Sequence, residues 1–279
     1  MSTHVASAET IPSTAAGVRA PIGLFVVIYT LAFAGTSILH ELAHAVTSAL
    51  FGGNPVMFTS HVRHGLTSGA AAAWAAAAGP LGSLAQGALL AAVLPALSRR
   101  SPAVRLLCVW GCIDGFVNFF GYLLTTPFAT RGDLGKVAVS LAWPSSVIWT
   151  AFGLGVLGIL AVGTLSAHLL LRFAPSPEAV ESARARSRFI VEIGVLPWLI
   201  GGALSALDAY PATYWLPYAY PLLSGCFLLG TRRHAARLSS PERHAQPWLG
   251  TRLWPWALAL GAVAVLFVFV LRPGVRVAW

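Results

Sequence analysis

Two histidines and a glutamate stand together in an otherwise apolar stretch near the start of the chain. The pentapeptide is His40-Glu41-Leu42-Ala43-His44, inside the apolar run 22–51. An ionisable side chain at the centre of a bilayer costs about 2.5–3.5 kcal/mol, so such groups persist where they pair, line water or hold a metal. Residues four apart lie on one face of a helix, so both imidazoles can reach one ion. Glu41 projects beside them, where a general base can meet a water that the ion activates.

Two simpler interpretations of the pentapeptide stay open. The histidines could be hydrogen-bonded to neighbouring helices with Glu41 as their partner, or they could bind a metal without catalysis. Coincidence is a weaker explanation, because a chance His-Glu-x-x-His arises in roughly one in 200 chains of this His and Glu content. The spacing therefore predicts a metal site.

The composition is that of a membrane protein. The chain has 279 residues, of which 57% are hydrophobic and 10% are charged, and its mean hydropathy is +0.73. A soluble domain carries about 25% charged residues. We therefore expect an all-α, polytopic integral protein of the cell membrane, with the lipid bilayer as a partner. The net charge of +9 indicates cytoplasmic loops and anionic lipid in such a protein, and not nucleic acid.

Seven apolar stretches approach or exceed the length of a membrane span, which predicts about six to seven transmembrane helices. The sixth is the shortest and contains Pro217 and Pro221, so we expect it to be kinked or re-entrant. Residues 1–20 are polar and are expected to form a disordered tail. The seven stretches are 22–51, 70–97, 103–126, 146–172, 189–208, 213–231 and 252–271.

The segment 52–65 differs from its surroundings. It has turn residues at both ends and a β-prone centre, and it is too short and too polar to span a membrane. We expect it to form a short β-like element, one or two strands, against the end of the first helix. His61 and His64 in this segment are expected to be solvated unless they assist a substrate or a metal.

Together these motifs resemble the site-2 protease family of intramembrane zinc metalloproteases. The β-like segment is followed by Gly79-Pro80 in the second stretch, and later by a run from Asn118 through Pro127 to Asp133. In that family a Gly-Pro motif marks the second core helix, and an Asn-x-x-Pro stretch leads to an aspartate that is the third zinc ligand. The resemblance covers roughly residues 22–140. It implies a zinc metalloprotease membrane core at 21–145, with additional transmembrane helices at 146–279.

Carried over residue by residue, the resemblance implies that His40, His44 and Asp133 bind zinc and that Glu41 is the catalytic base. One position would stay open on the ion, as catalytic zinc requires. The family's Asp-Gly reads Gly132-Asp133-Leu134 here, and Ser83 is nearest to the asparagine that often follows the Gly-Pro motif. A strand at 54–62 would bind substrate by edge addition, which is similar to the mode proposed for the family.

Three carboxylates compete for the place of third ligand. Asp133 follows Pro127 and Gly132, where a helix should break, so it could instead cap a helix at 134–141. Asp114 lies in the third apolar stretch, where an interhelical hydrogen bond is the simpler role. Glu192 in the fifth stretch could pair with Arg188.

The sequence thus predicts a membrane-embedded zinc metalloendopeptidase that hydrolyses peptide bonds in or near the membrane, in a transmembrane or membrane-associated protein substrate. One alternative is a multipass metal-binding sensor or transporter without proteolytic activity, which would need acidic residues spread through several helices. Another is a membrane zinc hydrolase that acts on lipidated or small substrates.

The orientation in the membrane is predicted in two opposite ways. With seven crossings, thirteen of the 18 basic residues fall on the side of the N-terminus. The positive-inside rule then puts the N-terminus in the cytoplasm and the loop 51–69 outside. The family resemblance implies the opposite side for the catalytic end of the first helix, which would mean an inverted branch or a different number of spans.

Overall fold

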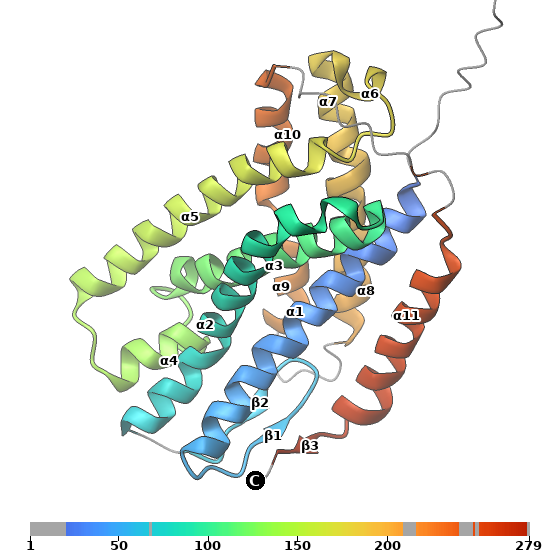
Figure 1. The fold of residues 1–279 in the computed structure, drawn as a ribbon. Coiled ribbons are helices and arrows are strands. Elements are labelled where there is room, and N and C mark those ends of the chain that lie inside the picture. Colours follow the sequence, from blue (N-terminus) through green and yellow to red (C-terminus); the bar gives the residue numbers. More distant parts are fainter. Residues whose placement is uncertain (1–20, 67–68, 209–215, 240–247, 249–250, 278–279) are drawn as a thin grey trace, which may run out of the picture.

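The computed structural model describes residues 21–66, 69–208, 216–239, 248 and 251–277, and the predicted tail 1–20 lies outside this part. The described chain is an all-α polytopic membrane protein with three short strands, as predicted (Figure 1). The α-helices are α1 (Ile22–Leu50), α2 (Gly69–Val93), α3 (Pro102–Thr125), α4 (Asp133–Ser140), α5 (Ser145–Leu171), α6 (Glu178–Glu181), α7 (Ala183–Ile190), α8 (Leu196–Asp208), α9 (Leu216–Leu223), α10 (Phe227–Arg237) and α11 (Trp254–Val265). A 3₁₀ turn follows α2 (η1, Leu94–Arg99), and π-helical turns join α7 to α8 (η2, Val191–Val195) and extend α11 (η3, Leu266–Leu271).

Six helical segments of the described chain are long and apolar enough to cross a membrane. They match the predicted stretches except the sixth, whose described part is broken into α9 and α10. Pro221 lies inside α9, and residues 224–226 form a turn before α10. The two short helices together lead the chain back toward the end at which α1 begins (Figure 1). The expected kink is therefore present. The six segments are Ile22–Leu50, Gly69–Arg99, Pro102–Thr125, Ser145–Leu171, Ala183–Leu207 and Trp254–Leu271.

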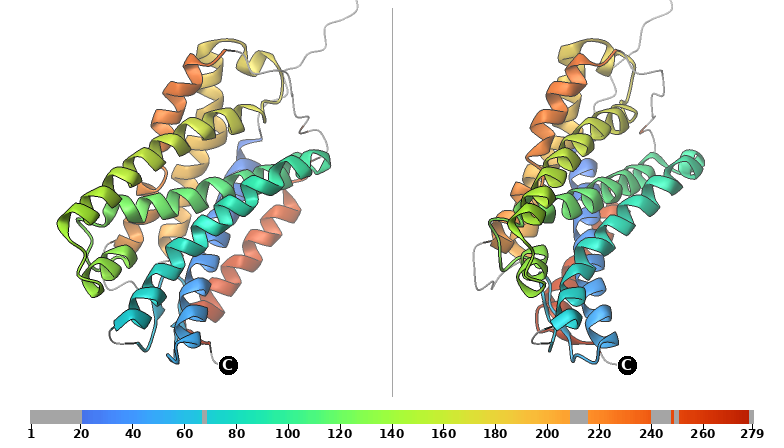
Figure 2. Two further views of the ribbon diagram at one scale, coloured as in Figure 1. Left: turned by 60° about the vertical axis from the view of Figure 1, so that its left-hand side comes forward. Right: turned by 90° about the vertical axis from the view of Figure 1, so that its left-hand side faces the viewer.

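Helix α1 runs through the middle of the bundle, against α2, α3 and α8 (Figures 1 and 2). Its upper half supplies buried aromatic side chains to the main core, where the Tyr29 ring meets the edge of Trp110 at 4.9 Å between centroids. Its lower half buries His40, Glu41 and His44 instead. The polar pentapeptide therefore faces other helices and not lipid.

The segment 52–65 forms the predicted β element, a hairpin of β1 (Val56–Met57) and β2 (Val62–Arg63). A third strand, β3 (Val275–Arg276), comes from the far end of the sequence and pairs antiparallel with the other side of β1. The small sheet lies at the end where α1 finishes (Figure 1). Because β1 is paired on both sides, the prediction that this strand binds a substrate at its edge is wrong for β1 itself. The outer edges belong to β2 and β3.

Candidate metal centre

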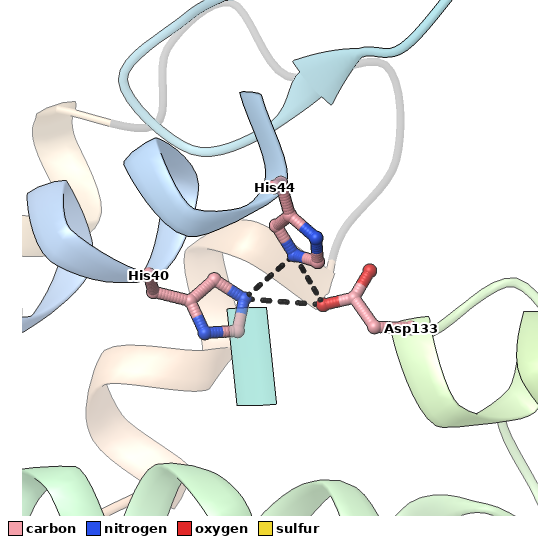
Figure 3. Close-up of side chains that lie close together, drawn as sticks. All are labelled: His40, His44 and Asp133. Carbon is pink, nitrogen blue, oxygen red and sulfur yellow. Dashed lines mark hydrogen bonds and ion pairs between the residues drawn. The ribbon is translucent and has the colours of Figure 1, made fainter. Parts of the chain in front are cut away.

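His40, His44 and Asp133 converge on one point between α1 and the start of α4 (Figure 3). The Nε2 atoms of the two histidines lie 3.1 Å apart, and Asp133 Oδ2 lies 3.1 Å from each of them. Four-coordinate zinc bonded to nitrogen and oxygen at about 2.0–2.1 Å holds its ligand atoms about 3.3 Å apart. The predicted convergence of these three side chains is therefore confirmed as geometry, while their role as ligands stays a prediction.

The other ring nitrogen of each histidine is held by α2. His44 Nδ1–H donates to the carbonyl oxygen of Ala75 at 2.7 Å, which leaves the Nε2 lone pair free. His40 Nδ1 lies 3.1 Å from the hydroxyl oxygen of Ser83, which can accept its proton. Three atoms with lone pairs 3.1 Å apart repel one another unless a proton or a cation lies between them. Hydrogen bonds from the Nδ1 atoms to a carbonyl and a hydroxyl oxygen are the arrangement that orients histidine ligands in metal sites.

Gly79 of the Gly-Pro motif faces the Nε2 atoms of both histidines. A Cβ built on Gly79 would lie 2.2 Å from His44 Nε2 and 2.6 Å from His40 Nε2. Any side chain at position 79 would therefore crowd both Nε2 atoms and the space that a bound ion would need. Pro80, directly after it, is tolerated within α2. The motif thus keeps one wall of the site free of side-chain atoms.

Asp133 is the first residue of α4, and the N-cap position before it is occupied by Gly132. The capping role considered from the sequence is therefore excluded, because the carboxylate turns toward the histidines. Lys136 Nζ lies 3.6 Å from the second carboxylate oxygen, Oδ1. Burial raises the pKa of Asp133, but the charge of a protonated His44 and hydrogen bonds from protonated His44 and His40 outweigh it and hold that pKa well below the usual range.

Glu41 lies beside the donor atoms and not among them. Its side chain is buried, with 8% of the residue exposed, and its Oε2 atom has no hydrogen-bond partner in the described part of the chain. Glu41 and His40 line a cavity of about 320 Å³ between α1, α3 and α9. A buried carboxylate oxygen without a partner is costly, which indicates that the site normally supplies one, such as a water molecule.

Later parts of the chain build much of this cavity. Asn118 from α3 and Tyr220 from α9 line it, and Asn118 Nδ2 donates to the Tyr220 hydroxyl at 2.7 Å. Phe267 from η3 and Thr59 from the hairpin turn line it too. Sequence reasoning missed Tyr220, because its segment carries no motif and its hydrogen bond to Asn118 joins residues about a hundred positions apart. Most of the lining is apolar, which fits an occupant with apolar groups.

Two aromatic rings flank the histidines. The Tyr122 ring stacks on His40, with centroids 5.3 Å apart and planes 9° apart. His64 meets the His44 ring edge-on at 5.4 Å, and its Nδ1 is buried without a hydrogen-bond partner among the described residues. Burial, the charge that His44 carries when protonated, and the charge of Lys136 lower the pKa of His64 to about 4. His61, which stacks on Phe58, lies outside the group of donor atoms, as His64 does. The expectation that both are solvated therefore fits His64 poorly.

The rival carboxylates lie elsewhere. Glu192 accepts from Arg188 Nε at 2.9 Å, the ion pair considered from the sequence. Asp114 lies within α3, and the one group of metal-binding side chains found in the described chain includes neither acid. Among the three candidates, Asp133 alone reaches the histidines.

Two imidazoles and one carboxylate form a set that suits zinc and other divalent first-row metals. No family model matches this chain, and no curated protein or solved structure is significantly similar to it. The case for a function therefore rests on the chemistry of the site itself.

Proposed function

We propose that this protein is a membrane-embedded zinc metalloprotease that hydrolyses peptide bonds in or near the bilayer, similar to the site-2 proteases. One observation carries the proposal. The donor atoms of His40, His44 and Asp133 form a triangle with 3.1 Å sides, and the unpartnered carboxylate of Glu41 lines the adjoining cavity. A buried carboxylate that lies beside the donor atoms and not among them suits the general base of a hydrolase.

The roles of the residues follow from their positions. A zinc ion bound here would supply Lewis-acid polarisation of the scissile carbonyl and of a water molecule. Glu41 takes a proton from that water and later gives it to the leaving amine. Ala75 and Ser83 hold the Nδ1 protons of the two histidines, so both Nε2 atoms keep their lone pairs toward the centre.

The substrate class follows from the cavity. Its walls are mainly apolar side chains from several membrane-crossing helices, with small polar groups such as Asn118 and Tyr220 near Glu41. An apolar peptide segment fits such walls, and its amide must be unwound from helical hydrogen bonds before Glu41 can act on it. The partner is thus a transmembrane or membrane-associated protein.

The test compares the purified protein with Glu41→Gln and with a His40→Ala/His44→Ala double variant. We expect about one zinc per chain in the first two and little in the third. Cleavage of a quenched fluorescent peptide of Leu and Ala should occur only with the unchanged protein. Equal cleavage by Glu41→Gln contradicts the proposal. Full zinc without any cleavage favours the metal-binding sensor or transporter.

We also place the protein in the cell membrane with the N-terminal end of α1 in the cytoplasm. The basic residues support this orientation, because thirteen of the 18 fall on the side of the N-terminus when the chain crosses the membrane seven times. A cysteine at Ser60 should then react with a membrane-impermeant maleimide in intact cells. Labelling only after permeabilisation would reverse the orientation and agree with the family resemblance.

A further inference from the structure

A groove with a strong positive charge lies far from the metal centre, between α7 and α10 at the end where α1 begins (Figure 1). Its volume is about 520 Å³. Arg232 Nε donates to the Ser187 hydroxyl at 2.8 Å, which fixes this guanidinium along α7. The lining residues are Ser187, Leu229, Arg232, Arg233, Ala236 and Arg237.

The three arginines of the groove find no acidic partner among the residues that the structure describes. No ion pair joins Arg232, Arg233 or Arg237 to a carboxylate in the described part of the chain. Arg233 and Arg237 are four residues apart on α10, where like charges repel. An anion bound between them would remove this repulsion.

A fourth guanidinium, that of Arg186, adds positive charge beside the groove. Arg186 is 7% exposed, and its nitrogens donate only to carbonyl oxygens, among them Ala235 at 3.0 Å and Ala236 at 3.3 Å. These carbonyls belong to the last turn of α10, whose negative dipole end would otherwise repel an anion. Arg186 therefore masks the carbonyls and leaves a buried positive charge beside the groove.

We propose that this groove binds the phosphate of an anionic phospholipid from the leaflet at the basic end of the molecule. Leu229 is 53% exposed and lies one helical turn before Arg233, a rise of about 6 Å along α10. Guanidinium groups thus meet the headgroup while an apolar side chain meets the start of an acyl chain. Arginine suits this role because its fork of N–H donors matches phosphate oxygens. A free phosphate ion would use the arginines but not Leu229.

The test measures lipid binding by the whole purified protein and needs no enzymatic activity. Delipidated protein in neutral detergent is titrated with phosphatidylglycerol, phosphatidylcholine or inorganic phosphate, and bound lipid is counted by native mass spectrometry. We expect phosphatidylglycerol to bind about tenfold or more tightly than phosphatidylcholine, with no competition from millimolar inorganic phosphate.

Variants locate the binding site. Arg232→Gln/Arg233→Gln/Arg237→Gln should lose this preference, while Arg99→Gln/Arg100→Gln/Arg172→Gln, with the same charge change at the same end, should keep it. The single exposed variant Arg233→Gln serves if the triple variant does not fold, and it should weaken phosphatidylglycerol binding several-fold. Equal binding of both lipids, equal losses in the two triple variants, an unchanged Arg233→Gln, or displacement by inorganic phosphate would each overturn the assignment.

Discussion

Replacing Gly79 with alanine is the most direct test of the metal centre. The added methyl carbon would lie 2.2 Å from His44 Nε2 and 2.6 Å from His40 Nε2, and real Cβ contacts essentially never fall under 3.0 Å. The His44 ring must therefore retreat by about 0.8 Å, the difference between 2.2 and 3.0 Å. The methyl group would thus take space beside the two Nε2 atoms that a bound ion would need.

Apart from this clash, Gly79→Ala should not lower the stability of the fold. Gly79 lies inside α2 with an ordinary helical backbone, and alanine favours a helix over glycine by about 1 kcal/mol. We therefore expect Gly79→Ala to fold and to melt within a few degrees of the parent protein, yet to hold less than about a tenth of its zinc.

The assay combines metal analysis by mass spectrometry with the visible absorption of a cobalt-substituted sample, which reports the geometry of the ligands. Gly35→Ala is the matched control, because Gly35 lies in α1 near the site and its Cβ would meet nothing within 4 Å. It should keep its metal. Full zinc and an unchanged cobalt spectrum in Gly79→Ala would refute the placement of the ion above this glycine.

Four further predictions follow from the same geometry. Glu41→Gln should keep zinc and slow peptide cleavage by about two to four orders of magnitude, measured with the fluorescent peptide, since an amide cannot accept the proton of water. Asp133→Asn should lose most of the zinc while Asp114→Asn keeps it, and equal zinc content in the two would contradict the ligand assignment. The lowered pKa of His64 makes the folded state bind fewer protons than the unfolded state between about pH 6.5 and 4. The free energy of unfolding should therefore decrease as the pH is lowered from about 6.5 to 4. His64→Gln should flatten this fall in melting temperature, and an unchanged profile would speak against a buried neutral His64. Deletion of residues 272–279 should release the hairpin from β3 and speed maleimide labelling of a cysteine at Ser60, whereas an unchanged rate would mean that β3 does not restrain it.

Local patterns predicted the parts of the site that depend on helix periodicity. The four-residue spacing of His40 and His44 fixed their common face, and Pro127 with Gly132 indicated the break that frees Asp133. The kink of the sixth stretch was likewise visible in Pro221. Each of these signals lies within a few residues of the feature that it specifies.

Contacts between distant segments could not be predicted in this way. The pairing of β3 with β1 joins positions more than two hundred residues apart, and nothing in Val275 or Arg276 marks them as a partner for Val56. Tyr220 reaches the cavity because α9, where the chain turns back, brings it within hydrogen-bonding distance of Asn118 on α3. A polar side chain in an apolar segment indicates burial but does not say against what.

Close backbone approach, more than the ligands themselves, sets the geometry of this site. The first helix alone presents two histidines to whatever lies opposite. Gly79 lets α2 pass directly behind their Nε2 atoms, and Gly115 lets α3 meet the backbone of α2, where a Cβ would be 2.6 Å from the Ser83 carbonyl oxygen. Gly135 does the same for α4, because a Cβ there would collide with the backbone at Ala129 and Thr130. Helix α4 can pack against the loop at Ala129 and Thr130 because residue 135 has no side chain. The position of Asp133 therefore depends on Gly135, which touches neither histidine. A larger side chain at 135 should thus disturb the metal centre by moving α4 as a whole, with every ligand still present in the sequence.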